Sequence, residues 1–136
     1  MGYKKNLIKH LVKNIEKAAK KHILVDLFPA TNNIIKLAAE NNFDIRGYKH
    51  VIDSYGIKHA LNKHNLIMAD ILKIPDIIKN ADKIIFEGIV KGMPRFKYEK
   101  RYNGSIYYVE EIRKGKQTLN IVTIYKIKTP SDAKSE

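Results

Sequence analysis

The stretch KIIFEGIVKGMPRFKYEKRYNGSIYYVEEIRKGKQTLNIVTIYKIK, residues 83–128, contains four runs in which apolar and polar residues tend to alternate. This period of two is typical of β-strands that bury one face. Turn-forming residues separate the runs, and Asn103-Gly104 is a strong signal for a hairpin. We therefore expect an antiparallel meander of four strands, formed by Lys83–Val90, Arg95–Arg101, Ser105–Ile112 and Leu119–Ile127.

The residues before this sheet show helical spacing. Between Tyr3 and Lys21 apolar residues recur every three or four positions, which predicts a basic amphipathic helix. Asn33–Glu40 is expected to form a second helix, and His22–Phe28 either a strand or a buried connector. A turn of helix over Asp70–Lys73 and another that begins near Pro75 should precede the sheet.

These elements predict an α+β fold with N-terminal helices packed on a four-stranded antiparallel sheet. We expect a basic helical segment over residues 1–44, a compact domain over residues 45–128 and a disordered polar tail over residues 129–136.

Three of the five histidines lie in RGYKHVIDSYGIKHALNKHNL, residues 46–66. Asp53 and Ser54 are good N-cap residues, so the following residues up to His64 should form a short helix. On that helix His64 falls on the apolar stripe, whereas His59 points away from it. The two helical histidines are therefore expected to face different ways.

Each histidine has a functional and a structural interpretation. His59 is either an acid/base group or phosphate ligand, or a solvated residue on the helix surface. His64 is well placed to meet the last carbonyls of its helix. His50 should lie in a loop before the helix, close enough to Asp53 to be oriented by it. A metal site is weakly supported, because the two helical histidines are five positions apart and cysteine is absent. We expect no metal and no cofactor.

The charge of the chain suggests a class of partner. Among 136 residues, 26 Lys and Arg against 14 Asp and Glu give a net charge of +12. This excess favours a polyanion such as nucleic acid. An anionic membrane surface or a merely lysine-rich composition remains an alternative explanation. The absence of cysteine is compatible with the cytosol. No apolar run is long enough to span a membrane.

One face of the predicted sheet carries polar and charged groups. On the second strand, positions that alternate with Phe96 and Tyr98 are Arg95, Lys97, Glu99 and Arg101. On the last strand, Thr123 and Tyr125 alternate with apolar residues. Such a face beside a histidine helix suits a phosphodiester substrate. An ordinary solvated sheet face, which would also carry Glu111 and Lys116, explains the pattern equally well.

Several motifs in order, GYKHVID, HALNKH, IPDIIKNADKI, MPRFKYEKR, the Asn-Gly hairpin, IYYVEEI and LNIVTIYK, together resemble a known family. They are similar to phage-associated nuclease domains of the barnase–EndoU–colicin–RelE fold, over about Ile45–Lys128. The resemblance implies a helix and a four-stranded antiparallel sheet, and a metal-independent ribonuclease or toxin-like effector of phage or mobile-element origin. Its motifs correspond here to His50, His59, His64, Arg95, Lys97, Glu99, Thr123 and Tyr125.

The first functional hypothesis is an RNA endonuclease. A histidine, His59 or His50, would take the proton from a ribose 2′-hydroxyl, which attacks the adjacent phosphorus. Another histidine or Glu99 would protonate the leaving oxygen. Arg95 and Lys97 would stabilise charge on the phosphate. The catalytic candidates are thus His50, His59, His64, Glu99, Thr123 and Tyr125. The candidates for substrate binding are Lys63, Arg95, Lys97 and Arg101.

The alternative hypothesis is a noncatalytic module that binds nucleic acid through the same basic face. An acidic immunity or antitoxin protein is expected as a partner of a toxic ribonuclease, in addition to RNA. The expected location is the cytoplasm of a bacterial host, with delivery by a phage as one route.

Overall fold

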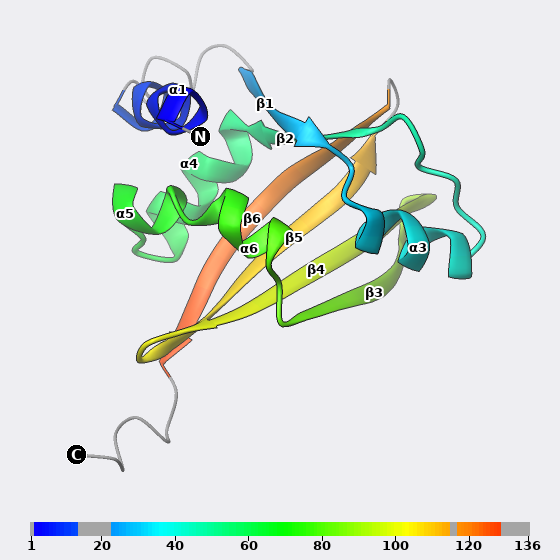
Figure 1. The fold of residues 1–136 in the computed structure, drawn as a ribbon. Coiled ribbons are helices and arrows are strands. Elements are labelled where there is room, and N and C mark those ends of the chain that lie inside the picture. The colour runs from blue at the N-terminus through cyan, green and yellow to red at the C-terminus, as the bar shows by residue number, and fades with distance from the viewer. Residues whose placement is uncertain (1, 14–22, 115–116, 129–136) are drawn as a thin grey trace.

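The computed structural model describes residues 2–13, 23–114 and 117–128, which form helices around one six-stranded sheet (Figure 1). The strand order is β1-β2-β6-β5-β4-β3. The strands are β1 (Leu24–Pro29), β2 (Lys49–Asp53), β3 (Lys83–Val90), β4 (Met93–Tyr102), β5 (Ser105–Lys114) and β6 (Thr118–Lys128). The helices are α1 (Gly2–Lys13), α3 (Asn32–Glu40), α4 (Ser54–Lys63), α5 (Met68–Ile71) and α6 (Ile74–Lys79).

The predicted antiparallel meander is confirmed in strands β3 to β6. Each of these strands pairs with the next one along the chain. Gly104 has φ +85° in the turn between β4 and β5, a backbone conformation that glycine adopts without strain. The register places Tyr108 of β5 opposite Tyr125 of β6, and Glu110 opposite Thr123. These pairs set the side chains of the polar face side by side.

The prediction of only four strands was wrong, because β1 and β2 extend the sheet. β2 runs parallel to β6, with Ile52 opposite Ile121, and β1 is antiparallel to β2. His50 lies in β2 and not in the expected loop. The strand KHVID is buried over its last four residues, so it lacks the alternation of a half-exposed strand. Its five residues therefore gave no periodic signal.

The helices largely follow the sequence pattern. The Asp53 Oδ1 accepts a hydrogen bond from the Tyr55 N–H at 2.9 Å, which confirms the predicted N-cap of α4. Pro75 lies in the first turn of α6 as expected. The turn of helix expected over Asp70–Lys73 begins earlier, as α5. Part of the predicted N-terminal helix, residues 14–22, and the predicted tail, residues 129–136, lie outside the described residues.

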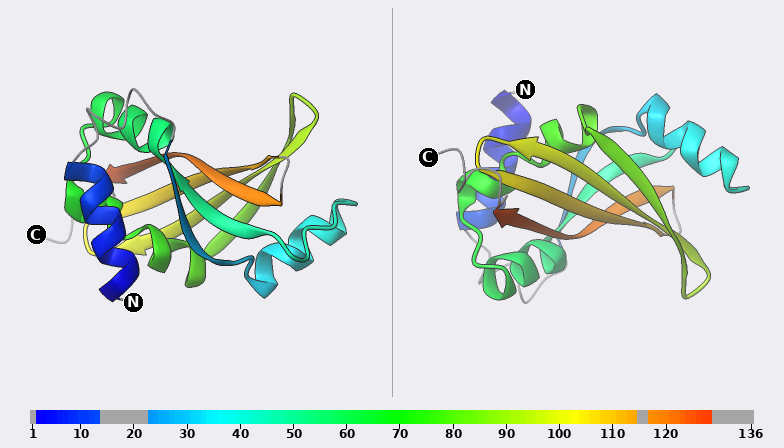
Figure 2. Two further views of the ribbon diagram at one scale, coloured as in Figure 1. Left: turned by 90° about the horizontal axis from the view of Figure 1, so that it is seen from above. Right: turned by 90° about the horizontal axis from the view of Figure 1, so that it is seen from below.

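The two sides of the sheet differ in their covering. Figure 2 shows α3 and α6 on one side of the sheet and α4 on the other. On the α3 and α6 side, Phe96, Tyr98 and Val109 are buried in the main core. On the α4 side the helix lies against β6. This arrangement leaves the outer surface of β4 and β5 partly exposed beside α4.

Contact between α4 and β6 depends on Gly56. A Cβ atom at this position would lie 2.5 Å from the Ile121 carbonyl oxygen and 2.9 Å from that of Val122. Both obstacles are backbone atoms in the sheet, so neither can rotate away. The helix backbone therefore approaches the strand at a distance that only glycine permits.

We expect Gly56→Ala to lower the free energy of unfolding by about 1–3 kcal/mol, the usual cost of overpacking. Alanine is intrinsically the better helix former, by about 1 kcal/mol, so a net loss would identify the clash. Urea denaturation provides the measurement, and Asn62→Ala on the exposed side of α4 is the control. A Gly56→Ala protein as stable as the wild type would contradict this account of the packing.

Candidate active site

Two histidines meet at the C-terminal end of α4. The ring centroids of His59 and His64 are 5.3 Å apart in an edge-to-face arrangement, and both residues are exposed. The expectation that they face different ways was therefore wrong. α4 ends at Lys63, and His64 is the C-cap residue with φ −114° and ψ 7°, outside helical geometry. Its side chain consequently leaves the position that a continuous helix would give it.

A row of rings connects this histidine pair to the sheet. The His64 centroid lies 5.7 Å from that of Tyr125, and the Tyr125 and Tyr108 rings stack at 5.0 Å. The Lys97 Nζ stands 5.3 Å from the Tyr108 centroid and 3.4 Å from the Glu87 Oε2. The row thus runs from α4 across β6 and β5 to β4, and it fixes the imidazoles relative to a cation.

A second cation lies beside the row, at Arg95. Its Nε and Nη2 donate to the Glu110 Oε1 at 3.0 and 2.6 Å. The side chains are 29% and 15% exposed, so the pair remains accessible from the surface. Partial burial, followed by the adjacent Glu110 carboxylate, raises the pKa of Tyr125 above its ordinary value. Tyr125 therefore stays protonated at neutral pH and its hydroxyl remains a hydrogen-bond donor.

The remaining predicted residues are distributed around this row. Thr123 pairs with Glu110 in the register, and its buried hydroxyl oxygen has no hydrogen-bond partner among the described residues. Glu99 is the cross-strand neighbour of Tyr108 and lies on the same face. Lys63 and Arg101 are exposed, and within residues 23–114 and 117–128 no ion pair or ring contact joins them to the row.

His50 is not part of this group. It is fully buried, and its Nδ1 lies 2.6 Å from the Glu111 Oε2. The Thr31 N–H donates to the His50 Nε2 at 3.3 Å, so the proton of a neutral ring sits on Nδ1 and points to Glu111. The Tyr98 hydroxyl donates to the other Glu111 oxygen at 2.7 Å. This buried network ties β2, β4 and β5 together, and it keeps His50 away from the polar face.

Sequence reasoning missed Glu110 and Tyr108. Alternation along β5 places both on the polar face, but IYYVEEI contains two tyrosines and two glutamates in succession. The pattern alone could not decide which member of each pair faces the core, and the interpretation of Glu111 as a residue of the solvated face was wrong. The structure buries Tyr107 and Glu111 and turns their neighbours to the polar face.

The described residues contain no cluster of three or more His, Cys, Asp and Glu residues that could hold a metal ion. None of the helices built from these residues is long and apolar enough to span a membrane.

The described residues thus form an α+β fold in which exposed imidazoles at the end of α4 lie beside guanidinium and carboxylate groups of the sheet. Residues 28–134 match the family model described as phage-Barnase-EndoU-ColicinE5/D-RelE like nuclease3. The match covers more than half of the chain, which therefore belongs to this nuclease family. The resemblance drawn from the sequence motifs is confirmed. Neither the curated proteins nor the solved structures gave a significant match.

The raised pKa of Tyr125 predicts a loss of stability in alkali. Above pH ~10 a phenol ionises in the unfolded chain but keeps its proton in the folded one. The folded state then binds more protons, so the free energy of unfolding falls as the pH rises. We expect Tyr125→Phe to make this fall less steep, as measured by urea denaturation between about pH 8 and pH 11. An unchanged slope would contradict the half-buried, Glu110-facing position of the phenol.

Proposed function

We propose that this nuclease cleaves RNA at the polar face, with His59 and His64 as the acid and base. The observation that carries the proposal is the contact between the two exposed imidazoles, 5.3 Å apart, at the edge of a face that holds Arg95 and Lys97. Imidazole exchanges protons near neutral pH, and a neighbouring pair supplies both a proton acceptor and a donor.

In the proposed reaction, the unprotonated imidazole takes the proton of a ribose 2′-hydroxyl. The 2′-oxygen forms a bond to the adjacent phosphorus while the bond from phosphorus to the 5′-oxygen breaks. The protonated imidazole gives its proton to that leaving oxygen, so the products are a 2′,3′-cyclic phosphate and a 5′-hydroxyl. The nucleophile belongs to the substrate, so DNA should not be cut and chelators should have no effect.

The charged residues of the face would stabilise the phosphate. Arg95 has two N–H groups directed at one Glu110 oxygen, which holds the guanidinium in place without removing it from solvent. Lys97 is similarly held by Glu87 and the Tyr108 ring. Charges that are positioned before the reaction cost little reorganisation. Tyr125 and Thr123 would orient the ribose, with Glu99, Lys63 and Arg101 as outer contacts, whereas buried His50 would act only through the fold.

A ribonuclease of this kind would act in the cytoplasm of a bacterium and would harm the cell that makes it. The net charge of +12 supports an acidic immunity protein or antitoxin as its inhibitor. A toxin-like role in phage or mobile-element conflict is consistent with the family to which the chain belongs.

The central prediction concerns the two histidines. We expect His59→Ala and His64→Ala each to lower the rate of RNA cleavage in EDTA by about 10²–10⁴-fold, the usual contribution of general acid–base catalysis. His10→Gln on α1 is the matched control and should cleave at the wild-type rate. Full activity in both alanine variants would overturn the assignment. Salt-dependent RNA binding without any turnover by the wild type would instead favour the noncatalytic binding module.

Arg95 provides a separate test of the phosphate contact. We expect Arg95→Ala to lower kcat by about 10²–10³-fold, as observed when one preorganised donor to a developing charge is removed. The control is Arg46→Ala, because Arg46 also pairs with a carboxylate, Asp44, but is 77% exposed and lies before β2. Both variants are assayed on a short single-stranded RNA. Equal cleavage rates for the two variants would contradict a contact between Arg95 and the phosphate.

A further inference from the structure

A second basic cluster lies on the side of the sheet opposite the histidines. Lys100 of β4, Tyr107 of β5 and Lys126 of β6 are cross-strand neighbours, so they form one row on one face. Successive residues of a strand point to opposite faces. Tyr107 and Lys126 therefore lie back to back with Tyr108 and Tyr125 of the proposed active site.

Aromatic rings hold the lysines of this cluster in place. The Lys73 Nζ stands 5.8 Å from the Tyr102 centroid and 5.5 Å from that of Tyr107. The Lys100 Nζ is 5.7 Å from the Tyr102 centroid, and the Lys126 Nζ is 5.7 Å from that of Tyr107. The two rings themselves pack edge to face at 5.1 Å. Three ammonium groups thus converge on one aromatic pair with restricted freedom.

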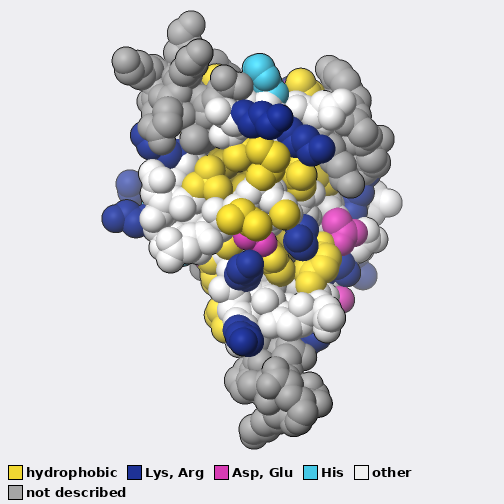
Figure 3. Space-filling view, turned by 90° about the vertical axis from the view of Figure 1, so that its left-hand side faces the viewer, with side chains coloured by type: hydrophobic (Ala, Val, Ile, Leu, Met, Phe, Trp, Pro, Cys, Tyr) yellow, Lys and Arg dark blue, Asp and Glu magenta, His cyan; other side chains and the backbone are white. Residues whose placement is uncertain are grey.

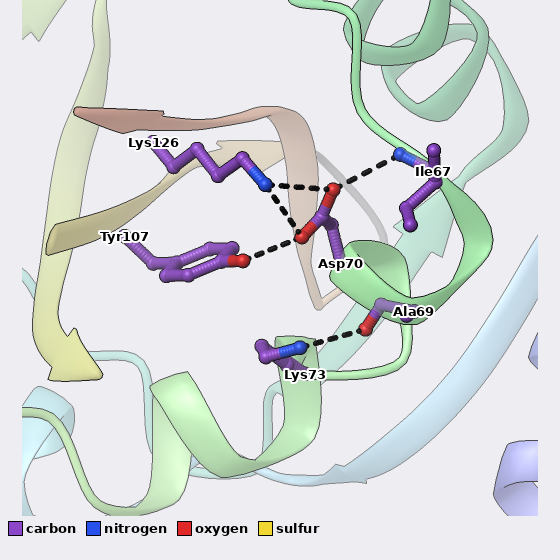
Figure 4. A network of polar contacts seen from close by, with 6 residues as sticks. All are labelled: Ile67, Ala69, Asp70, Lys73, Tyr107 and Lys126. Carbon is purple, nitrogen blue, oxygen red and sulfur yellow. Dashed lines mark hydrogen bonds and ion pairs between the residues drawn. The ribbon is translucent and has the colours of Figure 1, made fainter. Parts of the chain in front are cut away.

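Acidic residues compensate this charge only in part. Asp70 is buried and accepts hydrogen bonds from Tyr107, from the Ile67 N–H and from Lys126 (Figure 4). Burial acts to raise the pKa of Asp70, but the hydrogen bonds outweigh burial, so the pKa is lowered. Asp70 is therefore ionised and forms an ion pair with Lys126.

The other two lysines meet uncharged oxygen atoms. The Lys73 Nζ donates to the Ala69 carbonyl at 3.2 Å, and the Lys100 Nζ to the Asn80 carbonyl at 3.1 Å. Within residues 23–114 and 117–128, no ion pair joins either of them to a carboxylate. Figure 3 shows this end of the molecule, where basic side chains surround an apolar area. Asp76 accepts a hydrogen bond from the Tyr102 hydroxyl and interacts electrostatically with Lys100, so its carboxylate offsets part of this charge. Lysines that are held in place without a direct ion pair still favour an anionic ligand.

We propose that Lys73, Lys100 and Lys126 form a second contact for the phosphate backbone of single-stranded RNA. This inference rests on the proposed function, because it assigns a further binding site for the same substrate. A strand that crosses the end of the sheet near the β4–β5 turn would meet the histidine row on one face and the lysine cluster on the other. Long strands would then bind through both contacts, and short ones through the active site alone.

The test uses a labelled single-stranded RNA of about 30 nucleotides with 2′-O-methyl groups, which has no 2′-hydroxyl nucleophile and cannot be cleaved by the proposed reaction. Binding is measured by fluorescence anisotropy over a range of KCl concentrations. We expect the Lys73→Gln/Lys100→Gln variant to reduce the slope of log K against log[KCl] by about 1.4, or about 0.7 for each phosphate that is no longer neutralised. Lys126 is retained because it pairs with buried Asp70.

The matched control is Lys36→Gln/Lys91→Gln, which makes the same change in net charge. These two exposed lysines lie on α3 and in the β3–β4 turn, away from the β4–β5 turn (Figure 1). The control should keep the wild-type slope. An unchanged slope in the test variant, an equal decrease in the control, or no binding by the wild type would overturn the inference.

Cleavage of unmodified RNA by the same proteins separates the two proposals. If the wild type binds with the expected slopes but does not cleave, the proposed function fails and the second contact stands. If the wild type cleaves and the slope of the test variant is unchanged, only the second contact fails.

Discussion

The close approach of α4 to β6 is the constraint on which the candidate site depends. Gly56 lets the helix backbone contact the Ile121 and Val122 carbonyl groups, and Asp53 caps the helix while it accepts a hydrogen bond from Asn120 at 3.2 Å. The start of α4 is thereby tied to β6, and its last turn reaches the row of rings on the sheet. This contact, together with the ring contact between His64 and Tyr125, fixes the positions of His59 and His64 relative to the sheet cations.

Much of the fold could be predicted from the sequence, because the strands of the meander bury only one face. The period of two from Lys83 to Ile127 and the Asn-Gly turn were sufficient to predict the meander and its order. β2 could not be predicted in this way, because a short parallel strand buried on both sides shows no alternation of apolar and polar residues. The misplacement of His50 followed from the same cause, since its burial depends on Glu111, 61 positions later in the chain.

The candidate site was predictable in composition but not in geometry. The histidines of α4 and the charged face of β4 were identified from their types and spacing. The meeting of His59 with His64 depends on where the helix ends, and helix ends are poorly determined by local sequence. Glu110 was missed because a pair of adjacent glutamates leaves open which one is buried. Tertiary packing, which decides both questions, is not encoded in the periodicity of a single segment.

The two faces of the sheet carry polar side chains with different roles. On one face, Glu111 is fully buried and holds Tyr98 and His50 by hydrogen bonds. On the other face, Glu110 holds Arg95 where solvent and substrate can reach it. Two consecutive glutamates therefore have different roles because the strand turns them to opposite sides. The same alternation separates Tyr107 from Tyr108 and gives the molecule two distinct basic surfaces.

The most direct test of the proposed site is an NMR titration of the wild-type protein with a short 2′-O-methyl RNA, in which the imidazole signals of the histidines are followed. We predict that the signals of His59 and His64 shift in proportion to the RNA bound, whereas the signal of buried His50 stays nearly constant. RNA binding that leaves the signals of His59 and His64 unchanged would contradict the assignment of this face as the site of cleavage.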